Sequence, residues 1–196
     1  MYVPEKFRES DPDRLNELIE GYPFGTLVTC NKGLPFASHI PFISHENELW
    51  CHLAKTNPQY EHLDKGEEML CIFTGPHSYV SPSWYESPGV PTWNYAVAHV
   101  YGIPSIIRNK PDLAMLVERF TRHFEAGNPD PWEPDYDDQL LSAIVGVQIR
   151  ITEIQGKFKL SQNRPLLDRE RVISRLESTG DSLSEEVAKL MRKNAS

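Results

Sequence analysis

Cationic and neutral hydrogen-bond donors are concentrated in one short run near the C-terminal end of the chain, Gly156-Lys-Phe-Lys-Leu-Ser-Gln-Asn-Arg-Pro165. The donors are Lys157, Lys159, Ser161, Gln162, Asn163 and Arg164. Because the chain has a net charge of −8, this concentration stands out from the average composition. A guanidinium, ammonium groups, a hydroxyl and amides together suit a phosphate. The alternative is a basic edge strand, in which lysines block aggregation.

A second candidate anion site lies in the run from Cys51 to Gln59, where a predicted strand meets a predicted helix. Backbone amides at a helix N-terminus attract anions. Thr56 or Asn57 would cap this helix, and Lys55 would lie beside it. An ordinary capped helix start is the alternative, and this stretch taken alone favours it.

Aromatic side chains gather in the segments 75–85 and 90–95. We expect an ordered loop over residues 75–92 that closes over a planar ring, buries a subunit interface or forms a lid within one subunit. With the two candidate anion sites, this loop indicates a ligand with an anionic end and a flat aromatic end. FMN, pyridoxal phosphate and haem all meet that description.

The elements that must position these residues are mainly strands. Alternating apolar residues predict strands over 24–30, 36–43, 49–53, 69–74, 93–107 and 144–154. A turn at Gly156 is expected to follow the last of them. Helical spacing and capping residues predict helices over 10–21, 57–66, 109–127, 137–143, 168–177 and 182–193. This order predicts a mainly β fold with peripheral helices (α+β), an antiparallel barrel rather than a doubly wound fold.

Composition excludes several classes of protein. The acidic net charge and the lack of a basic reading helix argue against general nucleic-acid binding. No apolar run reaches the roughly 20 residues of a membrane span, and no secretory signal opens the chain. Cys30, Cys51 and Cys71 have no CxxC spacing, which predicts reduced core cysteines in a cytoplasmic protein. His39 and His52 lie in strands expected to be adjacent, but no histidine has metal-site spacing.

Four longer motifs resemble the PaiB-type family of FMN-binding negative transcriptional regulators. They are Gly75-Pro-His-x-Tyr-Val-Ser-Pro-x-Trp-Tyr85, Val90-Pro-Thr-Trp-Asn-Tyr95, Ala143-Ile-Val-Gly146 and Gly156-Lys-x-Lys-Leu-Ser-Gln-Asn-Arg164. The opening Met-Tyr-Val-Pro and the segment Asn57-Pro58-Gln59 are also similar. The resemblance implies an FMN-binding split β-barrel of the antiparallel Greek-key type, and a homodimer with FMN at the interface. It places this domain over 1–165, with an inserted helix about 111–126, and a helical extension packed on the barrel over 166–196.

The same resemblance implies the residues that bind FMN. The phosphate and ribityl side falls on Ser38, His39, Ile40, His52, Ala54, Lys55 and Asn57. The partner subunit offers either Trp93 and Asn94 or the run with Lys159, Ser161, Gln162 and Arg164. The segment between Trp84 and Val90 is shorter than in the family, so the lid over the ring departs from the family pattern.

These residues and the resemblance are compatible with three functions. The resemblance implies a regulatory flavoprotein, and the acidic composition indicates that it acts through a protein partner or flavin redox state rather than by binding DNA. The alternative is an FMN-dependent oxidoreductase, for which His39, His77 and Tyr79 are acid–base candidates but no catalytic residue is identified. A haem-binding or haem-degrading split barrel is the third, since histidine is a common axial ligand.

Overall fold

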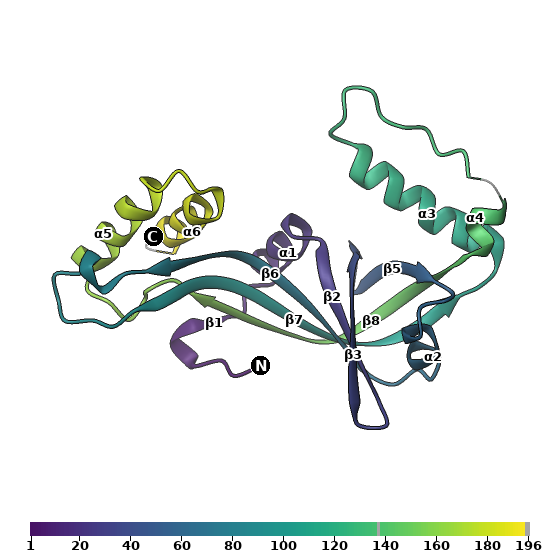
Figure 1. Ribbon diagram of the computed structural model, residues 1–196, viewed down its shortest axis with the longest axis horizontal. Coiled ribbons are helices and arrows are strands. Elements are labelled where there is room, and N and C mark those ends of the chain that lie inside the picture. The colour runs from purple at the N-terminus through teal and green to yellow at the C-terminus, as the bar shows by residue number, and fades with distance from the viewer. Residues whose placement is uncertain (137, 195–196) are drawn as a thin grey trace. The chain divides into compact units, whose positions relative to one another are not determined.

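The computed structural model describes residues 1–136 and 138–194 and is built mainly from antiparallel strands (Figure 1). The strands are β1 Arg8–Glu9, β2 Phe24–Asn31, β3 Leu34–Pro41, β4 Ile43–His45, β5 Glu48–Ala54, β6 Met69–Val80, β7 Thr92–Ile107 and β8 Ile144–Lys159. Their order in the sheet is β3-β2-β6-β7-β8-β5-β4, and β1 pairs with β8. The β2–β3 and β4–β5 pairs are hairpins. The single strand predicted over 36–43 is interrupted at Phe42, so β4 rather than β3 forms the hairpin with β5.

The remaining elements are helices. They are the single turns η1 Glu5–Phe7 and η2 Pro82–Trp84 and the helices α1 Pro12–Gly21, α2 Gln59–Leu63, α3 Lys110–Glu125, α4 Asp138–Ser142, α5 Leu166–Glu177 and α6 Ser182–Lys193. The chain divides into two compact units. Unit 1 comprises Met1–Gly21, Thr74–Ala98 and Gln155–Ser196, and unit 2 comprises Tyr22–Phe73 and His99–Ile154. The predicted division at residue 165 stays a prediction.

The core of unit 2 follows from strand periodicity. Leu49, Cys51 and Leu53 are buried on one face of β5, and the residues between them lie on the other face. Phe42 and Phe73 meet edge to face with ring centroids 5.3 Å apart. The predicted helix near 111–126 is present as α3, and its capping residue Asn109 accepts a hydrogen bond from the Asp112 amide at 3.0 Å.

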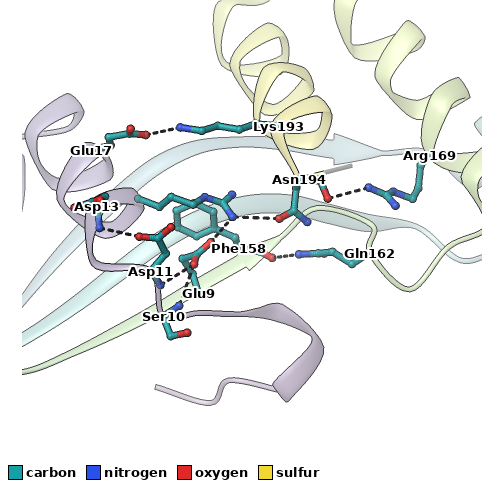
Figure 2. A network of polar contacts seen from close by, with 11 residues as sticks. Glu9, Ser10, Asp11, Asp13, Glu17, Phe158, Gln162, Arg169, Lys193 and Asn194 are labelled. Atoms are coloured by element: carbon teal, nitrogen blue, oxygen red, sulfur yellow. Dashed lines mark hydrogen bonds and ion pairs between the residues drawn. The ribbon is translucent and has the colours of Figure 1, made fainter. Parts of the chain in front are cut away.

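Unit 1 is held together by contacts between its N-terminal and C-terminal parts (Figure 2). Arg14 of α1 forms an ion pair with Glu9 at 2.7 Å and lies 5.0 Å from the centroid of the Phe158 ring. Lys193, at the end of α6, pairs with Glu17 at 2.7 Å. These contacts tie α1, the end of β8 and α6 into one framework. In the same unit α5 and α6 pack against each other (Figure 1). Val172, Leu176 and Met191 of these helices are buried.

The segment 75–80 was expected to be a loop, and this expectation is wrong. β6 continues through Gly75 and Pro76 to Val80, with buried and exposed residues alternating after Pro76. The pairing of β2 with β6 reaches only Ile72, so beyond that residue β6 has an edge without β2. Proline is tolerated on such an edge because no ladder hydrogen bond is required of it there.

The expected turn at Gly156 is also absent. Gly156 is part of β8 and pairs with Glu9 of β1. A Cβ atom at this position would lie 2.4 Å from Leu15 Cδ2 and 2.7 Å from the Glu9 carbonyl oxygen. Glycine is therefore needed here for the close approach of β1 and α1. Lys157 and Lys159 consequently belong to the strand itself.

The cysteines were expected to lie in the core. Cys51 and Cys71 are buried, but Cys30 is exposed because it lies on the outward face of β2. Burial raises the pKa of the Cys51 thiol, so this group stays protonated and unreactive. Among the residues described, none of the helices is long and apolar enough to cross a membrane.

Candidate functional site

A pocket of about 230 Å³ lies in unit 1, where the N-terminal segment meets the ends of β7 and β8. Its lining residues are Lys6, Phe7, Tyr85, Val90, Thr92, Asn94, Lys159, Ser161, Asn163 and Arg164. Lys6, Lys159 and Arg164 give this pocket its charge, and no Asp or Glu is among the described residues that line it. The pocket is therefore cationic, in a chain whose net charge is −8.

Lys159 is the half-buried cation of this pocket. Burial lowers the pKa of its ammonium, and the charges of Lys157 and Lys6 lower it further. Its Nζ donates to the Thr92 hydroxyl. An anion in the pocket would offset both the burial of this charge and the repulsion among the lysines.

Arg164 is held in one position by two contacts. Its guanidinium carbon lies 4.2 Å from the centroid of the Tyr85 ring, and Nη1 donates to the Pro88 carbonyl at 2.9 Å. The ring contributes a cation–π contact and limits the conformations of the long side chain. The other N–H groups of the Arg164 guanidinium can donate two parallel hydrogen bonds to a phosphate or a carboxylate.

Two buried polar residues form the inner wall of the pocket. The Asn94 amide donates to Ser161 Oγ at 2.9 Å, and the Ser161 hydroxyl donates to Asn94 Oδ1 at 3.2 Å. Ser161 has a φ of 61°, which is unusual for a residue other than glycine. The Arg164 amide donates to the Ser161 carbonyl at 2.9 Å, so this turn also holds the backbone of Arg164 in place. Strained backbone of this kind is concentrated at functional sites.

Trp93 and Gln162 do not line this pocket, although both were expected in the site. Trp93 is 52% exposed and lies next to His77 and Tyr79, with ring centroids 6.2 Å away in each case. Gln162 donates to the Phe158 carbonyl at 2.5 Å (Figure 2). It also accepts from the Leu160 amide at 2.7 Å. Its side chain thus stabilises the turn after β8. Asn94, Lys159, Ser161 and Arg164 are the expected residues that the pocket brings together.

The other expected residues lie in unit 2, where Ser38 and Asn57 are in contact. Asn57 Nδ2 donates to Ser38 Oγ at 3.0 Å, while Asn57 Oδ1 accepts from the Gln59 amide at 3.0 Å. Thr56 and Asn57 were the two expected caps of this helix, and Asn57 is the one whose side chain accepts a hydrogen bond from a backbone amide of the helix start. Lys55 is exposed, and its Nζ donates to the Ser142 carbonyl at 2.6 Å. Because Ser38 accepts from Asn57, its own hydroxyl proton is available to a ligand.

The remaining expected residues are distributed around this group. His39 is exposed on β3, and its Nδ1 lies 3.0 Å from the Thr26 hydroxyl, while Ile40 follows it half-buried. Ala54 is exposed at the end of β5, and its carbonyl accepts from the Asn57 amide at 2.9 Å. His52 packs edge to face on Phe120 of α3 at 5.2 Å. β3 and β5 were expected to be adjacent strands, but they are not neighbours in the sheet order.

His52 makes the stability of the protein depend on pH. Burial lowers its pKa, so the folded chain favours the neutral imidazole. An unfolded histidine titrates near pH ~6.5, so the unfolded chain takes up its proton first as the pH falls. The contribution of this group is present above that pH and is lost below it. In urea denaturation we expect the free energy of unfolding to fall from about pH 7 towards about pH 5. The fall should be smaller in His52→Gln.

Two of the residues that line the pocket in unit 1 lie outside every motif that sequence reasoning singled out. Lys6 and Phe7 reach it because β1 pairs with β8, with Arg8 opposite Lys157. The pairing of β1 with β8 brings together residues far apart in the sequence. No local pattern in the first residues predicts it. Within residues 1–136 and 138–194, no group of three or more His, Cys, Asp and Glu side chains is placed to hold a metal ion.

Comparison with known proteins identifies relatives by sequence. Residues 1–153 match the family described as "Putative FMN-binding domain". The chain is 33% identical to the "Protease synthase and sporulation protein PAI 2" of Bacillus subtilis, over 97% of this chain and 96% of that protein. The chain therefore belongs to this family of FMN-binding proteins.

Solved structures of the same fold extend this result. The flavocytochrome Anf3 of Azotobacter vinelandii aligns with a TM-score of 0.66 and 14% identity, over 80% of this chain and 72% of that chain. The FAD and heme binding protein of Mycobacterium smegmatis aligns with a TM-score of 0.61 and 21% identity, over 78% and 73%. At these identities the likeness shows the fold alone. The predicted fold class, a mainly β antiparallel split barrel with helices, is confirmed.

Proposed function

Because this chain belongs to the PaiB-type family of FMN-binding proteins, we propose that it is a homodimeric flavoprotein that regulates transcription negatively without itself binding DNA. FMN is the cofactor of the family. The dimer, the residues that hold the flavin and the regulatory role are parts of the proposal.

The FMN site is proposed from one observation, the group of hydrogen-bond donors formed by Ser38, Lys55 and Asn57 near the end of β5. Lys55 supplies an ammonium, Asn57 an amide, and Ser38 a hydroxyl whose proton is not used by Asn57. These groups fit a dianionic phosphate, because charge-assisted bonds from several donors are its usual recognition. We place the FMN phosphate here and the ribityl chain along His39, Ile40, His52 and Ala54. When bound, FMN supplies electron-transfer chemistry, and the protein binds and orients it.

For the flavin ring we favour Trp93 of the second copy over Asn94. Asn94 is fully buried and engaged with Ser161, whereas Trp93 is 52% exposed. Together with the exposed rings of His77 and Tyr79 it forms an aromatic face on β6 and β7. Exposed aromatic groups of this kind mark a surface that a ligand or partner covers. A dimer would cover it with a second chain and its flavin.

The regulatory part of the proposal rests on kinship and charge. The name of the Bacillus subtilis relative refers to protease synthesis and sporulation, which supports a role in gene control. The net charge of −8 opposes direct contact with DNA, since phosphate-backbone affinity comes from clustered Lys and Arg. A protein partner, or the redox state of the flavin, would then transmit the signal.

Two measurements on the purified protein test this proposal. After FMN is added and the excess is removed by gel filtration, we expect the visible absorption of bound flavin at one FMN per chain. Sedimentation should give twice the mass of one chain. A monomer that retains no flavin would contradict the proposal. A mobility-shift assay at moderate salt should show no sequence-specific DNA complex, and a tight complex would refute indirect regulation.

A further inference from the structure

We propose that the cationic pocket of unit 1, lined by Lys6, Lys159, Arg164 and Ser161, binds the phosphate group of a second small molecule, a phosphate monoester other than FMN. This inference rests on the proposed function, in which the donor group of Ser38, Lys55 and Asn57 takes the phosphate of the flavin. One FMN carries one phosphate. Because Ser38, Lys55 and Asn57 take that phosphate in the proposed function, the donors of this pocket are left for the phosphate of a second ligand.

The charges of the pocket are not neutralised by acids that line it. Lys159 donates to the Thr92 hydroxyl, and Arg164 donates to the Pro88 carbonyl. Asp168 is the acid near Arg164, but it accepts from the Glu86 amide at 2.8 Å and from the Ser87 hydroxyl. Its carboxylate keeps its charge and also interacts with Arg164, from outside the lining of the pocket. A dianion would satisfy all three cations of the pocket at once.

The pocket is also prepared for a ligand before one binds. Arg164 is fixed against Tyr85, and the turn at Ser161 keeps its φ of 61° through bonds to Asn94 and Arg164. Donors that are already in place lose less conformational entropy when an anion arrives. The backbone strain at Ser161 is of the kind that persists at ligand sites.

The size of the pocket limits what enters it. Its volume of about 230 Å³ is below the roughly 300–1,000 Å³ of pockets that hold a whole drug-sized ligand. The pocket accordingly takes one end of a ligand. A phosphate monoester fits this requirement, because its tetrahedral dianion accepts from ammonium, guanidinium and hydroxyl donors that converge from different directions.

The inference is tested by calorimetric titration of inorganic phosphate into FMN-saturated protein, in a phosphate-free buffer of constant ionic strength. We expect one phosphate per chain to bind while FMN stays bound. Lys159→Met and Arg164→Leu should each weaken phosphate binding about ten- to a hundred-fold, as expected for the loss of a charge-assisted bond. Lys159→Arg should restore most of the affinity.

Lys189→Met is the matched control, since it removes the same charge from exposed α6 of the same unit. It should leave phosphate affinity within about twofold, because Lys189 does not line the pocket and its exposed charge is screened by solvent and salt. Urea denaturation of each variant separates loss of the site from loss of folding.

Three outcomes separate the two proposals. If FMN saturation abolishes phosphate binding, or if Lys159→Met weakens FMN but not riboflavin, the pocket holds the phosphate of the flavin and the inference is overturned. Equal phosphate affinity in wild type and both pocket variants overturns it as well. If the protein binds no flavin but binds phosphate with the expected variant effects, the FMN proposal fails while the pocket assignment stands.

Discussion

Replacing Lys55 by glutamine is expected to lower the affinity for FMN by about ten- to a hundred-fold, because a charged hydrogen bond to a phosphate contributes about 1.5–3 kcal/mol. The affinity for riboflavin, which lacks the phosphate, should change little. Fluorescence titration with both flavins measures the two affinities in the same variant.

Lys65→Gln is the control for this prediction. Lys65 is an exposed lysine of the same unit, and its Nζ donates to Asn31 Oδ1 at 2.6 Å. Its loss should leave both flavin affinities unchanged. An equal fall for FMN and riboflavin in Lys55→Gln would show that Lys55 acts on the fold or the ring, and the phosphate assignment in unit 2 would be wrong.

Gly156→Ala is expected to destabilise unit 1 and to impair its pocket. The new methyl group would meet Leu15 Cδ2 at 2.4 Å and the Glu9 carbonyl oxygen at 2.7 Å, and forcing such contacts typically costs about 1–3 kcal/mol. Because Glu9 belongs to β1, the strand that follows Lys6 and Phe7, its displacement would move both residues. We expect a lower free energy of unfolding in urea and weaker phosphate binding.

The matched control is Gly21→Ala, at the end of α1. A Cβ atom there has no neighbour within 4 Å, so the substitution should leave phosphate binding unchanged. If Gly156→Ala were as stable and bound phosphate as well as wild type, the close packing of β1 and α1 on Gly156 would not position the pocket.

Patterns confined to one element predicted the fold well. The alternation of Val145, Val147 and Ile149 marked β8, and amphipathic helical spacing placed α6 at the bounds that the structure has. The errors arose where a residue type has two uses. Gly156 and Pro76 are common turn residues, yet one allows a close approach of two segments and the other lies in a strand beyond the reach of β2.

The candidate site was predictable in its chemistry but not in its assembly. The charges and donors of the run from Lys157 to Arg164 indicated an anion site, and four of the expected residues do line one pocket. Which side chains face that pocket depends on alternation along β7, which turns Asn94 inward and leaves Trp93 exposed. The contribution of Lys6 depends on the long-range pairing of β1 with β8, for which a local pattern holds no signal.

We propose that this protein binds FMN through the phosphate of the flavin, in unit 2. The most direct measurement is the ratio of the affinities of the wild-type protein for FMN and riboflavin, taken by fluorescence titration under identical conditions. We expect FMN to bind about ten- to a hundred-fold more tightly, because of the charge-assisted bonds to its phosphate. Equal affinities for the two flavins, or the binding of neither, would contradict it.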